Sequence, residues 1–158
     1  MKNINSILFV CLGNICRSPL AQGIAQDYVD RYNLDIKIYS CGTSSYHIEE
    51  NPCSNSIKVA KLHNIDISKY KASQLTIQEI KEYDLIIALD QSNYNDILQL
   101  GCDSSKLYKL GYFGDNNQDV PDPYFFDGFD GFEKVYDMID SCVKELFEKW
   151  YKIYTIYK

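Results

Sequence analysis

Short apolar runs alternate with segments of helical periodicity along this chain, and this alternation limits the possible folds more than any other feature. The apolar runs are rich in β-branched and aromatic residues and predict strands over residues 7–10, 36–40, 85–89 and 107–110. Strands joined by helices form a parallel sheet with helices on both faces. At 158 residues, with no repeat or low-complexity linker, the chain is expected to be one domain over residues 1–158. Residues 151–158 are expected to be a C-terminal tail.

The helical segments lie between and after these strands. Helices are predicted over residues 19–33, 54–64, 91–101 and 132–150, and residues 76–82 are predicted to be a short helix or a turn. Pro19 suits a first helical turn, Asp90 is a good N-cap, and His63 is expected to cap a helix end. The last stripe also fits a coiled-coil seam, but in a small α/β domain such a stripe usually docks a helix on the sheet. Gly, Asn, Asp and Pro make residues 111–127 a predicted loop.

Charge and cysteine content exclude several classes of protein. Sixteen Lys and Arg against 22 Asp and Glu give a net charge of −6, which disfavours a nucleic-acid or anionic-membrane binder without excluding one local anion site. The apolar run at residues 7–12 is too short for a signal peptide, and no stretch approaches the roughly 18 residues of a membrane span. We therefore expect a cytoplasmic protein without a membrane span. Six scattered cysteines form no CxxC pair, so we expect free thiols, no metal and no cofactor.

One segment combines the residue types of an anion site with those of a nucleophile. The first strand runs directly into Cys-Leu-Gly-Asn-Ile-Cys-Arg-Ser-Pro, residues 11–19. A loop between a strand end and a helix start can curl so that its N–H groups and the helix dipole face one anion. Gly13 and Asn14 tolerate a left-handed backbone, and Arg17 offers a planar fork to two phosphate oxygens. The same field favours the thiolate of Cys11. The spacing of a cysteine six residues before an arginine is weak evidence by itself. The alternative interpretation is a buried thiol and a surface arginine at a turn between a strand and a helix.

The segment at residues 11–19 resembles the phosphate-binding loop of the low-molecular-weight protein tyrosine phosphatases. Further matches extend over nearly the whole chain: Ser40 with residues 42–44, residues 90–93, and residues 122–124. The resemblance implies a Rossmann-like three-layer sandwich with a four-stranded parallel sheet flanked by helices, which agrees with the strand and helix pattern.

The resemblance also implies hydrolysis of phosphotyrosine in proteins, and of aryl phosphates, with phosphate or vanadate as inhibitors. Cys11 would take the phosphoryl group as phosphocysteine, Arg17 would clamp the phosphate, and Asp122 would be general acid and then general base. A turn is the alternative interpretation of Asp122, because Asp-Pro is a common turn sequence.

The remaining implied roles concern binding and support. The phosphate and the substrate ring would be bound by Leu12, Gly13, Asn14, Ile15, Cys16, Ser18, Tyr46 and Tyr124. Ser18, Asn14 and Ser40 would hold the loop in shape. His47 and His63 lie in no catalytic pattern. The chain departs from the family at residues 72–74, where an Arg is common before the Gln, and near Tyr70, where some members have a histidine.

Several alternatives remain open from the sequence. Thioredoxin-coupled arsenate reductases share the loop, but they need two further cysteines where this chain has none between Cys53 and Cys102. Protein-arginine phosphatases carry Thr where this chain has Ile15. A phosphotyrosine-binding module without activity would be expected to lack Cys11 or Asp122. The resemblance further implies a reversible disulfide between Cys11 and Cys16, unless Cys16 merely packs beneath the loop.

Overall fold

A computed structural model of the chain describes residues 4–126 and 128–151. Its centre is a four-stranded sheet in the order β2-β1-β3-β4, with every neighbouring pair parallel. The strands are β1 (Ser6–Cys11), β2 (Lys37–Gly42), β3 (Leu85–Ala88) and β4 (Leu107–Lys109). Central β1 is fully apolar from Ile7 to Val10 because it is covered on both faces. The predicted α/β fold with a four-stranded parallel sheet is confirmed.

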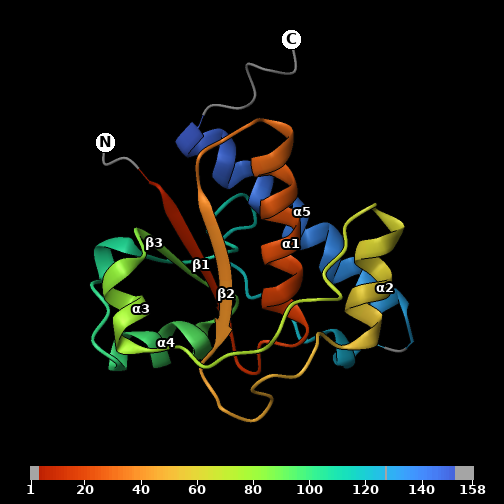
Figure 1. The fold of residues 1–158 in the computed structure, drawn as a ribbon, viewed down its shortest axis with the longest axis horizontal. Helices are drawn as coiled ribbons and strands as arrows, with labels where there is room; N and C mark the ends of the chain where they lie inside the picture. Colours follow the sequence, from red (N-terminus) through yellow and green to blue (C-terminus); the bar gives the residue numbers. More distant parts are fainter. Residues whose placement is uncertain (1–3, 127, 152–158) are drawn as a thin grey trace.

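Two helical layers cover the sheet (Figure 1). The helices are α1 (Arg17–Arg31), α2 (Ser54–Leu62), α3 (Ile77–Glu82), α4 (Gln91–Gln99) and α5 (Asp130–Tyr151). Helices α1, α2 and α5 contact one another on one face, while α3 and α4 lie on the opposite face. Helix α5 packs on α1 and α2, as expected for a docked helix rather than a coiled-coil seam.

Alternate residues of β1 enter the two apolar layers. Ile7 and Phe9 belong to the cluster that includes α1 and α5, whereas Leu8 and Val10 belong to the cluster that includes Ile80 of α3 and Ile97 of α4. The period of two follows from the pleat of a strand. Burial on both faces fixes the position of the carboxyl end of β1.

The helix ends follow the predicted capping residues. The Asp90 side chain accepts from Asn93 N at the start of α4, and His63 is the C-cap of α2, as predicted. The described part of the predicted loop, residues 111–126, also contains a 3-10 helix, η2 (Pro123–Phe125), and a bridge between Gly111 and Gln118. Residues 152–158 of the expected tail lie outside the described residues.

The described part of the chain contains no helix long and apolar enough to cross a membrane. Over the same residues, no group of three or more His, Cys, Asp or Glu side chains is arranged to hold a metal ion.

Candidate active site

The strand order reverses direction at β1, and a small cavity of about 210 Å³ lies beyond the carboxyl end of this strand. Such a switch point is the usual ligand site of an open parallel sheet. Most of the predicted site residues line the cavity: Cys11, Leu12, Gly13, Ile15, Cys16, Arg17, Tyr46, Asp122 and Tyr124. Asn14, Ser18 and Ser40 do not line it, because they are buried beneath the loop.

The loop that follows β1 turns around the sulfur of Cys11. Asn14 adopts a left-handed backbone, with φ at 57°, and its N–H donates to Cys11 Sγ at 3.2 Å. The Ser18 hydroxyl lies 3.0 Å from the same sulfur. Ser18 Oγ accepts from Asn14 Nδ2 at 2.8 Å, so its own proton can go to the sulfur or to the more distant Cys41 O, 3.5 Å away. The Asn14 N–H and the Ser18 hydroxyl therefore both lie within hydrogen-bonding distance of Cys11 Sγ.

The Asn14 side chain joins the loop to three separate segments. Its amide nitrogen donates to the hydroxyls of Ser18 and Ser40, the latter at 3.0 Å, and its oxygen accepts from Ser73 N at 3.0 Å. Residues 72–74, where the chain differs from the family, support the loop through the backbone N–H of Ser73. This hydrogen bond therefore does not depend on an arginine side chain. Gly42 allows the close approach, since a Cβ there would lie 2.7 Å from Leu12 O.

Arg17, the first residue of α1, is held from two directions. Its Nη1 donates to Asp90 Oδ2 at 2.8 Å and to Val120 O at 2.9 Å. Asp90 follows β3, and Val120 belongs to the long loop after β4, so both acceptors come from far along the chain. Both bonds leave from Nη1, so neither one occupies the opposite edge of the guanidinium, formed by Nε and Nη2.

Asp122 reaches the cavity from the long loop after β4. Its Oδ1 accepts from Tyr124 N at 3.0 Å, as the N-cap of η2, so the turn interpretation is correct without removing Asp122 from the cavity. Tyr46 and Tyr124 stand at the cavity mouth, 76% and 64% exposed, which leaves both rings accessible to a substrate.

His47 is a cavity residue that the sequence did not indicate. Its ring packs on Gly13, where a Cβ would lie 2.9 Å from His47 Cδ2, and its Nδ1 lies 2.8 Å from Glu50 Oε2. The position next to Tyr46 was the only available signal, because no spacing pattern links a histidine to a loop more than 30 residues earlier.

The expectation of six free thiols is wrong, because Cys16 and Cys53 form a disulfide. Their Cα atoms lie 5.5 Å apart, and Cys53 is brought to the loop by its N–H, which donates to Ile15 O at 2.7 Å. Cys16 is thus bonded to Cys53 and not to Cys11, which is free. The sequence gives no indication of this pairing across 37 residues.

The other free cysteines are chemically quiet. Burial raises the pKa of the Cys41 thiol well above its ordinary value, with contributions from Glu79 and Cys11. Burial likewise raises the pKa of Cys102, and that of Cys142 to about 12. These thiols stay protonated near neutral pH, so they are poor nucleophiles.

Known proteins resemble the chain over nearly its whole length. The family model "Low molecular weight phosphotyrosine protein phosphatase" matches residues 6–153. A phosphatase of that description from Saccharomyces cerevisiae is 36% identical over 154 residues, covering 91% of this chain and 94% of the yeast protein. The low molecular weight protein-tyrosine-phosphatase PtpA of Staphylococcus aureus is 39% identical over 145 residues, covering 90% of this chain and 91% of PtpA.

Among solved structures, a protein tyrosine phosphatase from Entamoeba histolytica with Hepes in its active site matches with a TM-score of 0.86 at 31% identity. The match covers 94% of this chain and 97% of that chain. Similarity in sequence and similarity in fold therefore indicate the same group of enzymes.

Proposed function

Because the chain belongs to the low molecular weight phosphotyrosine protein phosphatase family, we propose that it hydrolyses phosphotyrosine in proteins through a phosphocysteine on Cys11. The observation that carries this proposal is the cavity at the end of β1, which is lined by a free thiol, a partly buried arginine and a carboxyl group. Phosphoryl transfer needs little from a protein except an in-line nucleophile, positioning and charge stabilisation. These three side chains can supply all of them.

In the first step, the Cys11 thiolate attacks phosphorus and forms the S–P bond while the bond from phosphorus to the phenolic oxygen breaks. Asp122, protonated at this stage, gives its proton to the departing oxygen. The hydrogen bonds from Asn14 N and Ser18 Oγ stabilise negative charge on the sulfur. Arg17 binds two phosphate oxygens through Nε and Nη2, while Asp90 and Val120 hold Nη1.

In the second step, the Asp122 carboxylate takes a proton from water, and the resulting oxygen attacks phosphorus. The S–P bond breaks, its electrons return to Cys11 as thiolate, and inorganic phosphate leaves. Asp122 is protonated again, so the enzyme is restored. The product binds where the substrate phosphate was, which explains why phosphate and vanadate should inhibit.

The exposed rings of Tyr46 and Tyr124 support an aromatic leaving group. They stand at the mouth of the cavity, where they can flank a phenol ring, while apolar Ile15 offers nothing to pair with a guanidinium. We therefore prefer phosphotyrosine to phosphoarginine as substrate. A module that only binds phosphotyrosine would have no use for a free thiol beside Arg17.

The test is turnover of phosphotyrosine, phosphoserine and phosphoarginine peptides side by side, measured as phosphate release. Only the phosphotyrosine peptide is expected to be hydrolysed rapidly, and a Cys11→Ser variant should bind vanadate without turning over. Faster release from phosphoarginine would transfer the proposal to that substrate class. Substantial turnover by the Cys11→Ser variant would contradict a phosphocysteine.

We also propose that the activity responds to peroxide, with Cys53 taking part in addition to the expected pair of Cys11 and Cys16. Hydrogen peroxide oxidises the Cys11 thiolate to a sulfenic acid and is reduced to hydroxide. When Cys16 is reduced, its thiol attacks the sulfenic sulfur and releases water, giving a Cys11–Cys16 disulfide. The Cys53 thiolate then attacks Cys16, forms the disulfide present in this structure and releases Cys11 as thiolate. Cys53 would thus return the nucleophile to use.

A further inference from the structure

A second set of contacts lies next to Asp90 and Val120, the two residues that accept hydrogen bonds from Arg17. Asp119 directly precedes Val120, and Gln91 directly follows Asp90. One oxygen of Asp119, Oδ1, accepts from Gln91 N at 3.0 Å and from Lys109 Nζ at 2.9 Å. The segments that contain Asp90 and Val120 are therefore bonded to each other through the residues next to these two acceptors.

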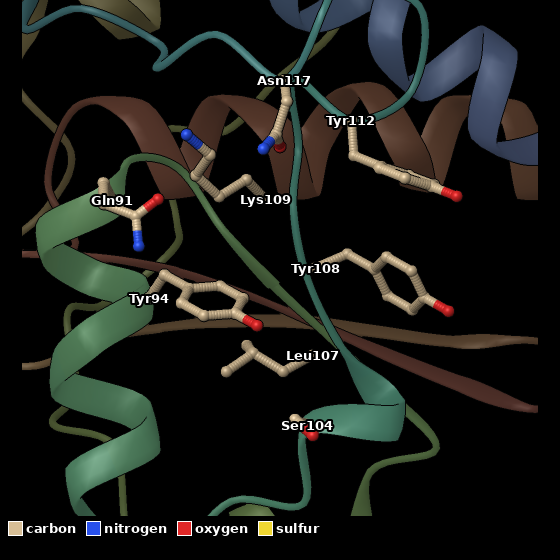
Figure 2. A pocket seen from close by; sticks show the side chains of 8 residues that line it. All are labelled: Gln91, Tyr94, Ser104, Leu107, Tyr108, Lys109, Tyr112 and Asn117. Carbon is tan, nitrogen blue, oxygen red and sulfur yellow. The ribbon is translucent and has the colours of Figure 1, made fainter.

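Lys109 is the buried end of this connection. It is the last residue of edge strand β4, and its side chain is 9% exposed, whereas that of Asp119 is 49% exposed. Lys109 lines a cavity of about 390 Å³ together with Gln91, Tyr94 and Asn117 (Figure 2). A buried ammonium needs an ionic partner, while a half-exposed carboxylate is also stable in water. The pair is therefore more important for Lys109 than for Asp119.

The long loop is attached on this side through residues 118–120. It folds back at its base, where Gly111 and Gln118 approach so closely that a Cβ on Gly111 would collide with Gln118 O. Beyond that point Asp119 bonds to Lys109 and Gln91, and Val120 N donates to Leu89 O at 2.8 Å. Without Lys109, Val120 keeps its backbone hydrogen bond to Leu89, but the neighbouring Asp119 loses its ion pair.

We propose that Lys109 is a positioning residue for Arg17, an inference that rests on the proposed function. Its ammonium fixes Asp119, Asp119 sets the distance between Val120 and Asp90, and these two acceptors orient the guanidinium toward the phosphate. Lys109 does not touch the cavity where the reaction takes place. Its effect should thus appear in the binding of the transition state, and it should be the same for every leaving group, because Arg17 binds the phosphate and not the phenol.

The experiment compares Lys109→Met with Lys106→Met. Both changes remove one positive charge and keep an unbranched side chain, and both lysines are partly or fully buried. Lys106 Nζ donates instead to the backbone oxygens of Ile80, Lys81 and Tyr83, and these three bonds do not involve the segments that hold Arg17. Lys106→Met therefore controls for charge and for lost stability.

We expect Lys109→Met to lower kcat about tenfold on nitrophenyl and phenyl phosphates alike, and to weaken vanadate inhibition by a similar factor. KM should change less than kcat. Lys106→Met should stay within about twofold of the wild type in both measurements. All rates are measured at a temperature at which circular dichroism shows each variant folded.

A double variant keeps the inference testable if Lys109→Met does not fold. Combining Lys109→Met with Asp119→Asn removes both charges, so no unpaired charge stays behind. The double variant should show the same tenfold losses in kcat and in vanadate inhibition. Unchanged kcat and vanadate inhibition in a folded Lys109 variant would overturn the positioning role and leave Lys109 a purely structural residue. Wild-type protein without phosphatase activity would refute the proposed function instead, and vanadate affinity would then still decide the role of Lys109.

Discussion

Replacing Asn14 by alanine tests whether one buried side chain holds the phosphate-binding loop in shape. Asn14 is 3% exposed, makes three side-chain hydrogen bonds and has a left-handed backbone. Each hydrogen bond contributes about 1 kcal/mol net, and the left-handed conformation costs an alanine roughly 1 kcal/mol more. The variant should therefore lose about 4 kcal/mol of unfolding free energy. For a chain of this size, that loss lowers Tm on the order of 10 °C.

The matched control is Asn33→Ala. Asn33 also has a left-handed backbone, with φ at 51°, but it is exposed and lies just after α1, far from the loop. This change should cost only the conformational part, about 1 kcal/mol. The difference between the two variants therefore measures the three hydrogen bonds of Asn14.

Chemical denaturation and phosphatase assays on both variants complete the test. Asn14→Ala should also lose about a hundredfold in kcat while still folded, because the loop around Cys11 is displaced. Asn33→Ala should keep its full rate. A loss of stability for Asn14→Ala no larger than that for Asn33→Ala would refute the claim that the side chain supports the loop.

The remaining predictions concern the charged and sulfur groups of the site. Arg17→Lys should lower kcat about 10³-fold, because a point charge cannot bind two oxygens and keep the contacts to Asp90 and Val120; a near-normal rate would show that Arg17 does not bind the phosphate. Asp122→Asn should lower kcat/KM by about 10²–10⁴ on phenyl phosphate and much less on nitrophenyl phosphate, and an equal loss of kcat/KM on both would argue that Asp122 is structural. Cys53→Ser, reduced and then treated with mild peroxide, should accumulate a Cys11–Cys16 disulfide in peptide maps; wild type treated in the same way should hold Cys16–Cys53 with Cys11 free, and identical maps would contradict the exchange.

Local patterns predicted most of the fold, because strands buried on both faces have a continuous apolar sequence. Ile7 to Val10 could be recognised as a strand, and the capping role of Asp90 followed from its residue type and position. The strands β1 and β2 run one or two residues past the predicted ends, as at Gly42, where pairing with Cys11 continues past the apolar run, whereas β3 and β4 each end one residue earlier than predicted. The edge strand β4 was also found, although only three residues of it pair.

The tertiary contacts between residues far apart in the sequence could not be predicted. The Cys16–Cys53 bond requires α2 to begin beside the start of α1, and no short-range pattern specifies that approach. Val120 binds Arg17 through its backbone carbonyl oxygen. Every residue has this group, so the amino-acid type at this position gives no indication of the contact. Lys109 lies within the strand predicted over residues 107–110, and only the folded loop shows that its ammonium is buried against Asp119.

The most direct test of the account is detection of the phosphorylated enzyme. The Asp122→Asn variant can still release nitrophenol, which leaves without a proton, but it lacks the base for the second step, so the intermediate should accumulate. After rapid mixing with nitrophenyl phosphate and a denaturing quench, mass spectrometry should find one phosphoryl group on the peptide that contains Cys11. A Cys11→Ser companion should carry none. A phosphoryl group on another peptide, or none on the protein while nitrophenol is released in a burst, would contradict catalysis through Cys11.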